Sequence, residues 1–148
     1  MRFTSITINR IEYRPVTTPD MNDELQYLGG CLGLFNLRDK DKSRFRIFIA
    51  LLKALKSNEG MSSDDLASRL DLSRATVIHH LKNLMDAGIV EEVRGRYQLR
   101  VDTLEELLEA VRVDIDKTID DLKEVARNID KELGLNAPRK QVKNRTPF

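Results

Sequence analysis

The sequence predicts a mainly α-helical fold with one small β-hairpin, on the basis of three observations. Between residues 43 and 88, apolar residues recur at helical spacing in segments that are separated by capping and turn residues. Residues 89–101 then alternate apolar and polar side chains on either side of an Arg-Gly-Arg turn, which is typical of a hairpin. From residue 103 onward, a second helical apolar pattern runs for about thirty residues.

The first 42 residues carry the least regular pattern. Residues 2–14 are rich in β-branched and aromatic side chains and are followed by a proline, so we expect a strand or an extended arm. A short helix is expected over residues 21–28, broken by Gly29 and Gly30 and followed by the apolar run 31–37. Whether this part of the chain is a sensor, a dimer contact or a flank is left open by the sequence.

A longer amphipathic helix is expected to begin at Ser43. Its apolar residues lie three and four positions apart, which predicts one buried face, and Gly60 is expected to end the helix. The buried stripe comprises Phe45, Phe48, Ile49, Leu52 and Leu55.

Two shorter helices follow. Ser62 and Asp65 have the Ser-x-x-acid form of a capping box, and the buried face of the helix after them consists of Leu66, Ala67 and Leu70. The next helix covers residues 73–87, with Ser73 as its N-cap and with Val77, Leu81 and Leu84 as its buried positions. Gly88 suits the left-handed position that ends a helix, and Ile89 is expected to close back onto Leu84.

The hairpin comes directly after these helices. Its pattern consists of Val90 and Val93, a turn at Arg94-Gly95-Arg96, and then Tyr97, Leu99 and Val101. Helix, short helix, helix and hairpin in this order form a winged helix-turn-helix over residues 43–101.

The last helix has the pattern of a coiled coil. Thr103 and Glu106 have the Thr-x-x-Glu form of a helix cap. A narrow apolar seam follows in alternating steps of four and three, interrupted by Thr118. The seam consists of Leu104, Leu108, Val111, Ile115, Leu122, Val125 and Ile129. Residues 102–133 are therefore expected to be a dimerisation helix, and residues 134–148 a basic, disordered tail.

Charge is unevenly distributed along the chain, although the net charge is only +1. Residues 102–133 hold eleven acidic and five basic side chains, whereas residues 134–148 hold four basic and no acidic ones. Residues 1–101 carry sixteen basic and thirteen acidic side chains. In the net charge of the whole chain, the acidic segment 102–133 offsets the two mildly basic segments on either side of it. Such a distribution is expected if a basic surface faces the phosphates of a nucleic acid and a separate, acidic element has a different role.

Several classes of function find no support in the sequence. Cys31 is the only cysteine, so one chain can form neither a disulfide nor a cysteine-based metal cluster. No apolar run has the length of a membrane span or of a signal peptide, so we expect a cytoplasmic protein without a membrane partner. Phosphate-binding loops, nucleophile elbows and His-Glu-x-x-His patterns are missing, so we expect neither an enzyme nor a cofactor.

Residues 72–90 carry a family resemblance. The run Leu-Ser-Arg-Ala-Thr-Val-Ile-His-His-Leu, followed by Lys-Asn-Leu-Met-Asp-Ala-Gly-Ile-Val, resembles the recognition helix of the ArsR and MarR regulators. These families commonly show Leu-Ser-x-x-Thr-Val-x-x-His-Leu and then Leu-x-x-Ala-Gly-Leu/Ile-Val. The resemblance covers residues 43–101 and implies a winged-helix transcriptional regulator, more commonly a repressor.

The helical period assigns the candidate DNA contacts. With Val77, Leu81 and Leu84 inside, an outer face forms that suits a major groove, made of Arg74, Ala75, Ile78, His79 and Lys82. Arg74 could contact guanine, Ala75 and Ile78 thymine methyls, and His79 a base or a phosphate. Ser73 and Thr76 are placed for phosphate contacts, and Arg94 and Arg96 for the DNA backbone or the minor groove.

Each of these residues also has a structural interpretation. Ser73 caps its helix with or without DNA, and His80, beside Leu81, suits a structural role at least as well as base reading. Ile78 could instead contact another part of the fold, and the two wing arginines could belong to a solvated hairpin tip.

The ArsR resemblance raises the question of metal sensing. The sequence offers no cysteine pair, and both histidines fall on the expected reading helix, so we predict no metal site. A carboxylate site on the acidic helix is the alternative, although such a charge run is usually a solvated face.

The sequence as a whole therefore predicts a homodimeric, sequence-specific regulator that binds double-stranded DNA and acts as a repressor. Its operator, target genes and effector are left open. The alternative is a winged-helix scaffold that binds other proteins through its coiled coil.

Overall fold

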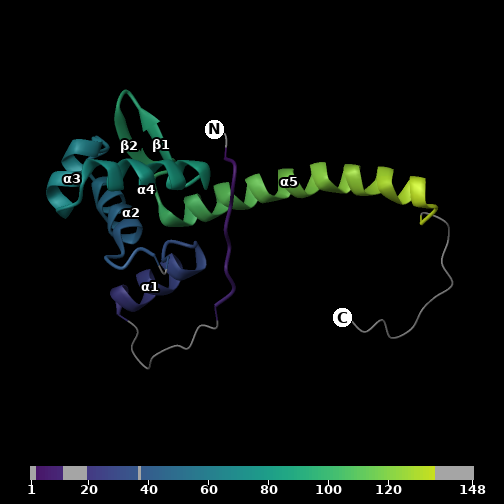
Figure 1. The fold of residues 1–148 in the computed structure, drawn as a ribbon, viewed down its shortest axis with the longest axis horizontal. Coiled ribbons are helices and arrows are strands. Elements are labelled where there is room, and N and C mark those ends of the chain that lie inside the picture. The colour runs from purple at the N-terminus through teal and green to yellow at the C-terminus, as the bar shows by residue number, and fades with distance from the viewer. Residues whose placement is uncertain (1–2, 12–19, 37, 136–148) are drawn as a thin grey trace. The chain divides into compact units, whose positions relative to one another are not determined.

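The computed structural model of the protein describes residues 3–11, 20–36 and 38–135. Its elements are α1 (Met21–Cys31), α2 (Ser43–Ala54), α3 (Ser63–Leu70), α4 (Arg74–Asp86), β1 (Val90–Val93), β2 (Arg96–Leu99) and α5 (Leu104–Leu133) (Figure 1). The two strands pair antiparallel, with Val90 opposite Leu99 and Val93 opposite Arg96. The predicted fold class, a winged helix-turn-helix with a long C-terminal helix, is confirmed.

The chain divides into two compact units, Met1–Val111 and Arg112–Phe148. The first unit contains the winged helix together with the beginning of α5, so the boundary between the two units lies inside α5. No helix in the described part of the chain is long and apolar enough to cross a membrane.

The core of the first unit is built around α2. This helix contacts α3, α4 and β2, so its buried surface is broader than a single stripe. Phe45 and Phe48 are buried as predicted, but Ile47 and Leu51 are buried too. The rest of the predicted stripe, Ile49, Leu52 and Leu55, is only half-buried against the core.

The end of α2 also differs from the prediction, because the helix stops at Ala54 and not at Gly60. Gly60 instead lies beside the wing, where a Cβ would come 3.0 Å from the carbonyl oxygen of Tyr97. The next residue, Met61, exchanges two backbone hydrogen bonds with Tyr97, of 2.9 and 2.7 Å. Gly60 thus permits the chain to run against β2.

The helix α1 continues through its two glycines, contrary to the predicted break. Asp20 caps it, accepting a hydrogen bond from the Asp23 backbone N–H at 2.8 Å. A Cβ at Gly29 would lie 3.1 Å from the ring of Phe35, and one at Gly30 would lie 2.8 Å from Ile11. The glycines are therefore sites of close packing rather than of helix termination.

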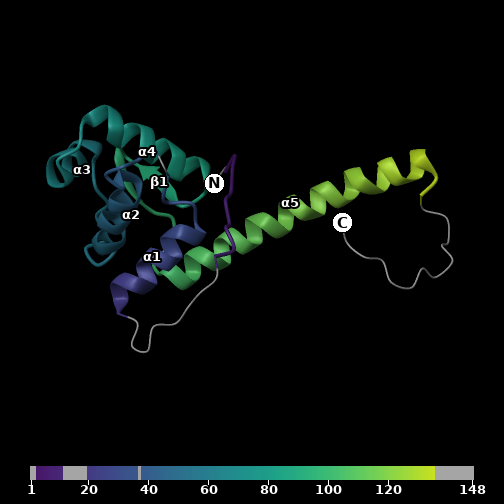
Figure 2. The ribbon, with the colours of Figure 1, turned by 60° about the horizontal axis from the view of Figure 1, so that its bottom comes forward.

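The apolar run after α1 contributes Leu32 and Leu34 to the core, whereas position 37 lies outside the described residues. Figures 1 and 2 show α1 and α3 both next to α2.

Residues 3–11 form an extended arm rather than a strand, and residues 2 and 12–14 of the predicted segment lie outside the described part. The backbone N–H groups of Thr4 and Ser5 donate to the carbonyl oxygen of Asp86, at 2.7 and 3.0 Å. Asn9 donates to the carbonyl oxygen of Cys31 at 2.7 Å. The arm thereby pairs carbonyl groups at the C-terminal ends of α4 and α1, which a helix cannot pair internally.

The expected caps at the starts of α3 and α4 and the expected end of α4 are confirmed. The hydroxyl oxygens of Ser62 and Ser73 accept hydrogen bonds from the third residue after each, at 3.0 and 3.1 Å. Gly88 has a φ of 75°, and the Ile89 N–H donates to the carbonyl oxygen of Leu84 at 3.0 Å. This pattern is a Schellman motif, and it fixes the direction in which the chain enters the hairpin.

At the wing tip, Arg94 and Gly95 have φ values of 54° and 77°. Positive φ at both central residues is the geometry of the type I′ turn, whose twist matches that of a two-stranded hairpin.

The beginning of α5 belongs to the winged-helix core. Thr103 caps the helix, accepting from the Glu106 N–H at 3.1 Å. Leu107, which lies outside the predicted seam, is fully buried, and Leu104 packs against the same core. Val111 is 3% exposed within the single chain, so its side chain is not available to a partner in the way the seam prediction requires.

The apolar residues that follow along α5 remain exposed. Leu122, Val125 and Ile129 have between 53 and 57% of their surface exposed. Of the predicted tail, only Gly134 and Leu135 are described, and the N–H of Leu135 closes the helix on the carbonyl oxygen of Asp130 at 2.8 Å.

Candidate nucleic-acid interface

The helix α4 has one buried and one exposed face. Val77, Leu81 and Leu84 are at most 1% exposed. The residues predicted to read DNA, Arg74, Ala75, Ile78, His79 and Lys82, all lie on the exposed face. Ile78 has 41% of its surface exposed, so it presents an apolar group outward.

Arg74 begins the exposed face and forms an ion pair with α3. Its Nε lies 3.5 Å from Oδ1 of Asp64, and both side chains are 73% exposed. Such exposed pairs contribute at most about 1 kcal/mol, so the guanidinium can leave Asp64 for a better partner at little cost.

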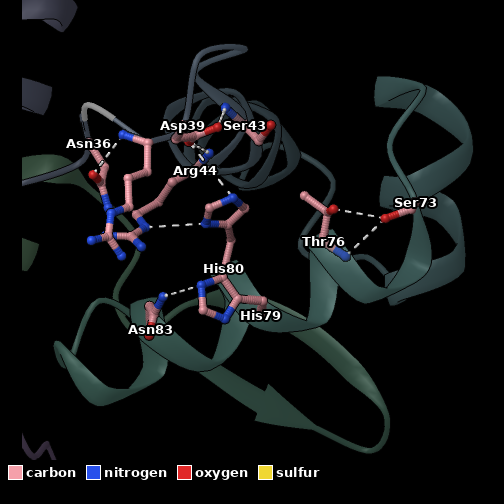
Figure 3. Close-up of polar contacts among 10 residues, drawn as sticks. Asn36, Asp39, Ser43, Arg44, Ser73, Thr76, His79, His80 and Asn83 are labelled. Carbon is pink, nitrogen blue, oxygen red and sulfur yellow. Dashed lines mark hydrogen bonds and ion pairs between the residues drawn. The ribbon is translucent and has the colours of Figure 1, made fainter.

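The hydroxyl groups of Ser73 and Thr76 are used locally. The Ser73 hydroxyl accepts from the Thr76 N–H and donates to the Thr76 hydroxyl oxygen at 2.8 Å (Figure 3). The capping role of Ser73 is therefore established by the fold itself, and a phosphate contact would be additional.

His79 lies on the exposed face next to Asn83, which the sequence did not single out. The amide nitrogen of Asn83 is 3.3 Å from Nε2 of His79 (Figure 3). Because the amide nitrogen is a donor, Nε2 acts as the acceptor and the ring proton sits on Nδ1. Asn83 thus holds the imidazole with its N–H group free to donate.

His80 points inward and joins α4 to the start of α2. Its side chain is 8% exposed, and its Nδ1 accepts from Nε of Arg44 at 3.3 Å. Its Nε2 lies 3.7 Å from Oδ2 of Asp39 on the other side (Figure 3). This arrangement places the proton of the neutral ring on Nε2, facing the carboxylate.

The carboxylate of Asp39 also caps α2. Its two oxygens accept the backbone N–H groups of Ser43 and Arg44, at 2.9 and 3.0 Å. Burial raises the pKa of Asp39, but these hydrogen bonds and the nearby His80 outweigh it and lower the pKa below its ordinary value.

The pKa of His80 is also lowered. Burial is the main cause, the charge of Arg44 adds to it, and the attraction of Asp39 only partly opposes it. Asp39, Arg44 and neutral His80 therefore form a buried polar cluster that fixes the position of α4. A structural role for His80 was one of the two interpretations of the sequence, but no local pattern indicates that Asp39 and Arg44 are its partners.

The two wing arginines have different surroundings. Arg94 is exposed at the tip of the hairpin. Arg96 is also exposed, with 47% of its side-chain surface accessible, but its Nε donates to the carbonyl oxygen of Glu59 at 2.9 Å and its Nη2 lies 3.8 Å from Oδ2 of Asp65. Arg96 thus connects the wing with the segment before α3, and a DNA contact by this residue remains a prediction.

In the described ranges, no three His, Cys, Asp or Glu side chains gather in a way that could hold a metal ion.

Comparison with protein families assigns a helix-turn-helix domain to residues 41–93, which include α2, α3, α4 and β1. This match supports a DNA-binding regulator of the winged-helix kind, without distinguishing the ArsR and MarR families. Neither the curated proteins nor the solved structures give a significant match to the chain.

Proposed function

We propose that the protein is a homodimeric, sequence-specific transcriptional regulator that reads double-stranded DNA with α4. The observation that carries the proposal is the exposed face of α4 inside a matched helix-turn-helix domain. Its side chains offer a cation (Arg74), an apolar group (Ile78) and an imidazole donor (His79) within the first two turns of one helix. A rigid helix with such a face fits the major groove, which is about 12 Å wide.

The role of each side chain follows from its chemistry. Arg74 can leave Asp64 and donate two parallel hydrogen bonds to guanine, and Ala75 and Ile78 suit the methyl group of thymine. His79 can donate from Nδ1, and Lys82 contributes a charge to the phosphates.

The wing adds affinity rather than specificity in this proposal. Arg94 at the hairpin tip contacts the DNA backbone or the minor groove. Arg96 acts mainly by holding the wing against the domain, because its Nε and Nη2 already donate to the carbonyl oxygens of Glu59 and Gly60.

The second unit supplies the dimer contact. Four exposed apolar residues of α5 lie at successive steps of three, seven and four residues, so they share one face: Ile119, Leu122, Ile129 and Leu133. An apolar face on an otherwise charged helix is stabilised when another helix covers it, and a second copy of the same chain offers an identical face. Ile119 and Leu133 widen the predicted seam, whereas Leu104 and Val111 drop out of it.

Regulation would then follow from occupation of the operator, and repression is the outcome that we propose. Catalysis has no part in this mechanism.

The test is a selection of duplexes from a random pool with the full-length protein, followed by titration at several salt concentrations. We expect an inverted repeat with half-sites about one helical turn apart, or a multiple of it, and affinity that falls linearly with salt on a logarithmic scale. A pool without an enriched motif would leave the protein-binding scaffold, with its exposed α5 face, as the better account.

A further inference from the structure

The segment directly before α2, residues 38–42, is basic on its outer side. Its sequence is Arg-Asp-Lys-Asp-Lys, and Asp39 is the one side chain that is turned inward, with 9% of its surface exposed. The other four side chains are exposed: Arg38, Lys40, Asp41 and Lys42. The segment therefore presents three positive charges and one negative charge to solvent, and none of them belongs to the DNA interface that the sequence predicted.

The inward contacts of Asp39 fix this segment beside α4. Its carboxylate accepts the backbone N–H groups of Ser43 and Arg44, at 2.9 and 3.0 Å, and its Oδ2 lies 3.7 Å from Nε2 of His80 (Figure 3). Arg44 in turn donates from Nε to the other ring nitrogen of His80 at 3.3 Å. Because both nitrogens of the buried imidazole are engaged in this way, the segment cannot shift along α4 without breaking these contacts.

The helical period shows which edge of α4 the segment follows. Thr76, His80 and Asn83 lie at steps of four and three residues, so they line one edge of the helix. The exposed reading face begins next to this edge, since the rings of His79 and His80 lie 5.3 Å apart between their centroids. The basic segment therefore flanks the reading face.

An edge of this kind meets the DNA backbone when a helix lies in the major groove. A helix with its side chains is about 10–12 Å across and the groove is about 12 Å wide, so a sugar–phosphate backbone runs along each edge of the helix. The side chains of Arg38 and Lys40 make no hydrogen bond or ion pair with the described residues. Lys42 is engaged elsewhere, because its Nζ lies 5.6 Å from the centroid of the Phe35 ring, at a cation–π distance. Arg38 and Lys40 are thus the two cations of the segment that suit a phosphate backbone.

We propose that Arg38 and Lys40 bind the phosphates of the DNA strand that runs along the Thr76–Asn83 edge of α4, as a contact surface separate from the reading face and from the wing. The inference rests on the proposed function, because it adds a part to the same DNA interface. Phosphate contacts set the register of a protein on the duplex and carry no direct sequence information. Asp39 lies between the two cations in the chain and contacts His80, so the position of the phosphates is passed to α4 through the buried cluster.

The first experiment measures the salt dependence of DNA binding by the full-length protein carrying Arg38→Gln with Lys40→Gln. If each residue neutralises one phosphate, the slope should fall by about 1.8, so the loss of affinity between about 50 and 200 mM salt should be about 12-fold smaller than in the wild type. The affinity for a selected operator and for a scrambled duplex should fall by similar factors at one salt concentration. Both side chains are exposed, so the double variant should fold normally.

A matched control removes the same charge from the other end of α2. Lys53 and Lys56 are exposed there, and Lys53 is about 15 Å from Ser43 along the helix axis. Lys53→Gln with Lys56→Gln should leave the salt slope unchanged. An equal reduction of the slope in the two double variants would show a general effect of charge and would overturn the proposal.

The second experiment locates the contact on the DNA. Single phosphates of the selected operator are replaced, one at a time, by uncharged methylphosphonates. The wild type should lose affinity at the phosphates that Arg38 and Lys40 contact, and the Arg38→Gln and Lys40→Gln variant should lose none at those positions while it keeps the other losses of the wild type.

The outcomes separate this contact from the proposed function. A double variant with the salt slope and the sensitive phosphates of the wild type would refute the contact and leave the reading of DNA by α4 standing. A wild type that binds no duplex at any salt concentration would refute both.

Discussion

Two leucines of α5 provide a matched pair of substitutions. One of them lies in the core of the first unit, and the other lies on the surface when the chain is considered without a partner. Leu107 is fully buried, whereas Leu122 has 57% of its surface exposed. Leu107→Ala removes a buried side chain and leaves a cavity, so we expect it to lower the free energy of unfolding by about 3–5 kcal/mol.

The expected effect of Leu122→Ala depends on the dimer. Alanine and leucine have similar helix propensities, so the substitution should cost little in an isolated helix. If a second copy covers the exposed part of Leu122, the substitution should cost about 1–2 kcal/mol per chain.

The assay is urea unfolding followed by circular dichroism at two protein concentrations about a hundredfold apart. The wild type and Leu107→Ala should both unfold at a higher urea concentration when more protein is present, because dimers resist unfolding by mass action. Leu122→Ala should lose most of this dependence. A loss below about 1 kcal/mol for Leu107→Ala would contradict its place in the core, and a wild type without concentration dependence would contradict the dimer.

Three other predictions concern the wing, the buried histidine and the apolar face. Arg94→Ala should reduce the salt slope of DNA binding by about 0.9 without changing stability. Arg96→Ala should instead lower the melting temperature, because it releases the wing from the Glu59 carbonyl oxygen. Equal behaviour of the two variants in calorimetry and salt titrations would show that this distinction is mistaken. The unfolded chain binds a proton at His80 more readily than the fold does, since its pKa falls below the ordinary 6.5 on folding. Stability should therefore decline as the pH drops below about 6.5, and denaturation at a series of pH values should show a flatter profile for His80→Gln. Finally, Ile115→Glu combined with Leu122→Glu should give a monomer by light scattering, and a monomeric wild type would remove the basis of that prediction.

The sequence predicted best those features that depend on neighbouring residues. Helix caps at Ser62 and Ser73, the Schellman end at Gly88 and the turn at Arg94 and Gly95 are local patterns, and all of them occur in the structure. The outward face of α4 followed from the helical period alone, because Val77, Leu81 and Leu84 mark the opposite side.

Features that depend on distant parts of the chain were missed. Gly29 packs against the ring of Phe35, so a residue that ordinarily ends a helix lies inside one. Leu107 fell outside the heptad pattern because the start of α5 packs on the winged helix and not on another α5.

The polar contacts of the site depend on tertiary structure in the same way. The partners of His80 lie 36 residues or more before it in the chain, and Arg96 reaches residues equally far away. Sequence spacing identifies such side chains as polar or basic, but not as already paired.

The most direct test of the central claim is the discrimination between a selected operator and a scrambled duplex, titrated at one fixed salt concentration. Arg74→Ala and His79→Ala should each lose affinity for the operator, by roughly 1–3 kcal/mol if Arg74 makes a bidentate base contact, and far less for the scrambled duplex. Both variants should fold normally, because both side chains are exposed, and Arg127→Ala in the second unit serves as the control for loss of a charge. If both variants discriminate as well as the wild type, α4 does not read the sequence of the DNA.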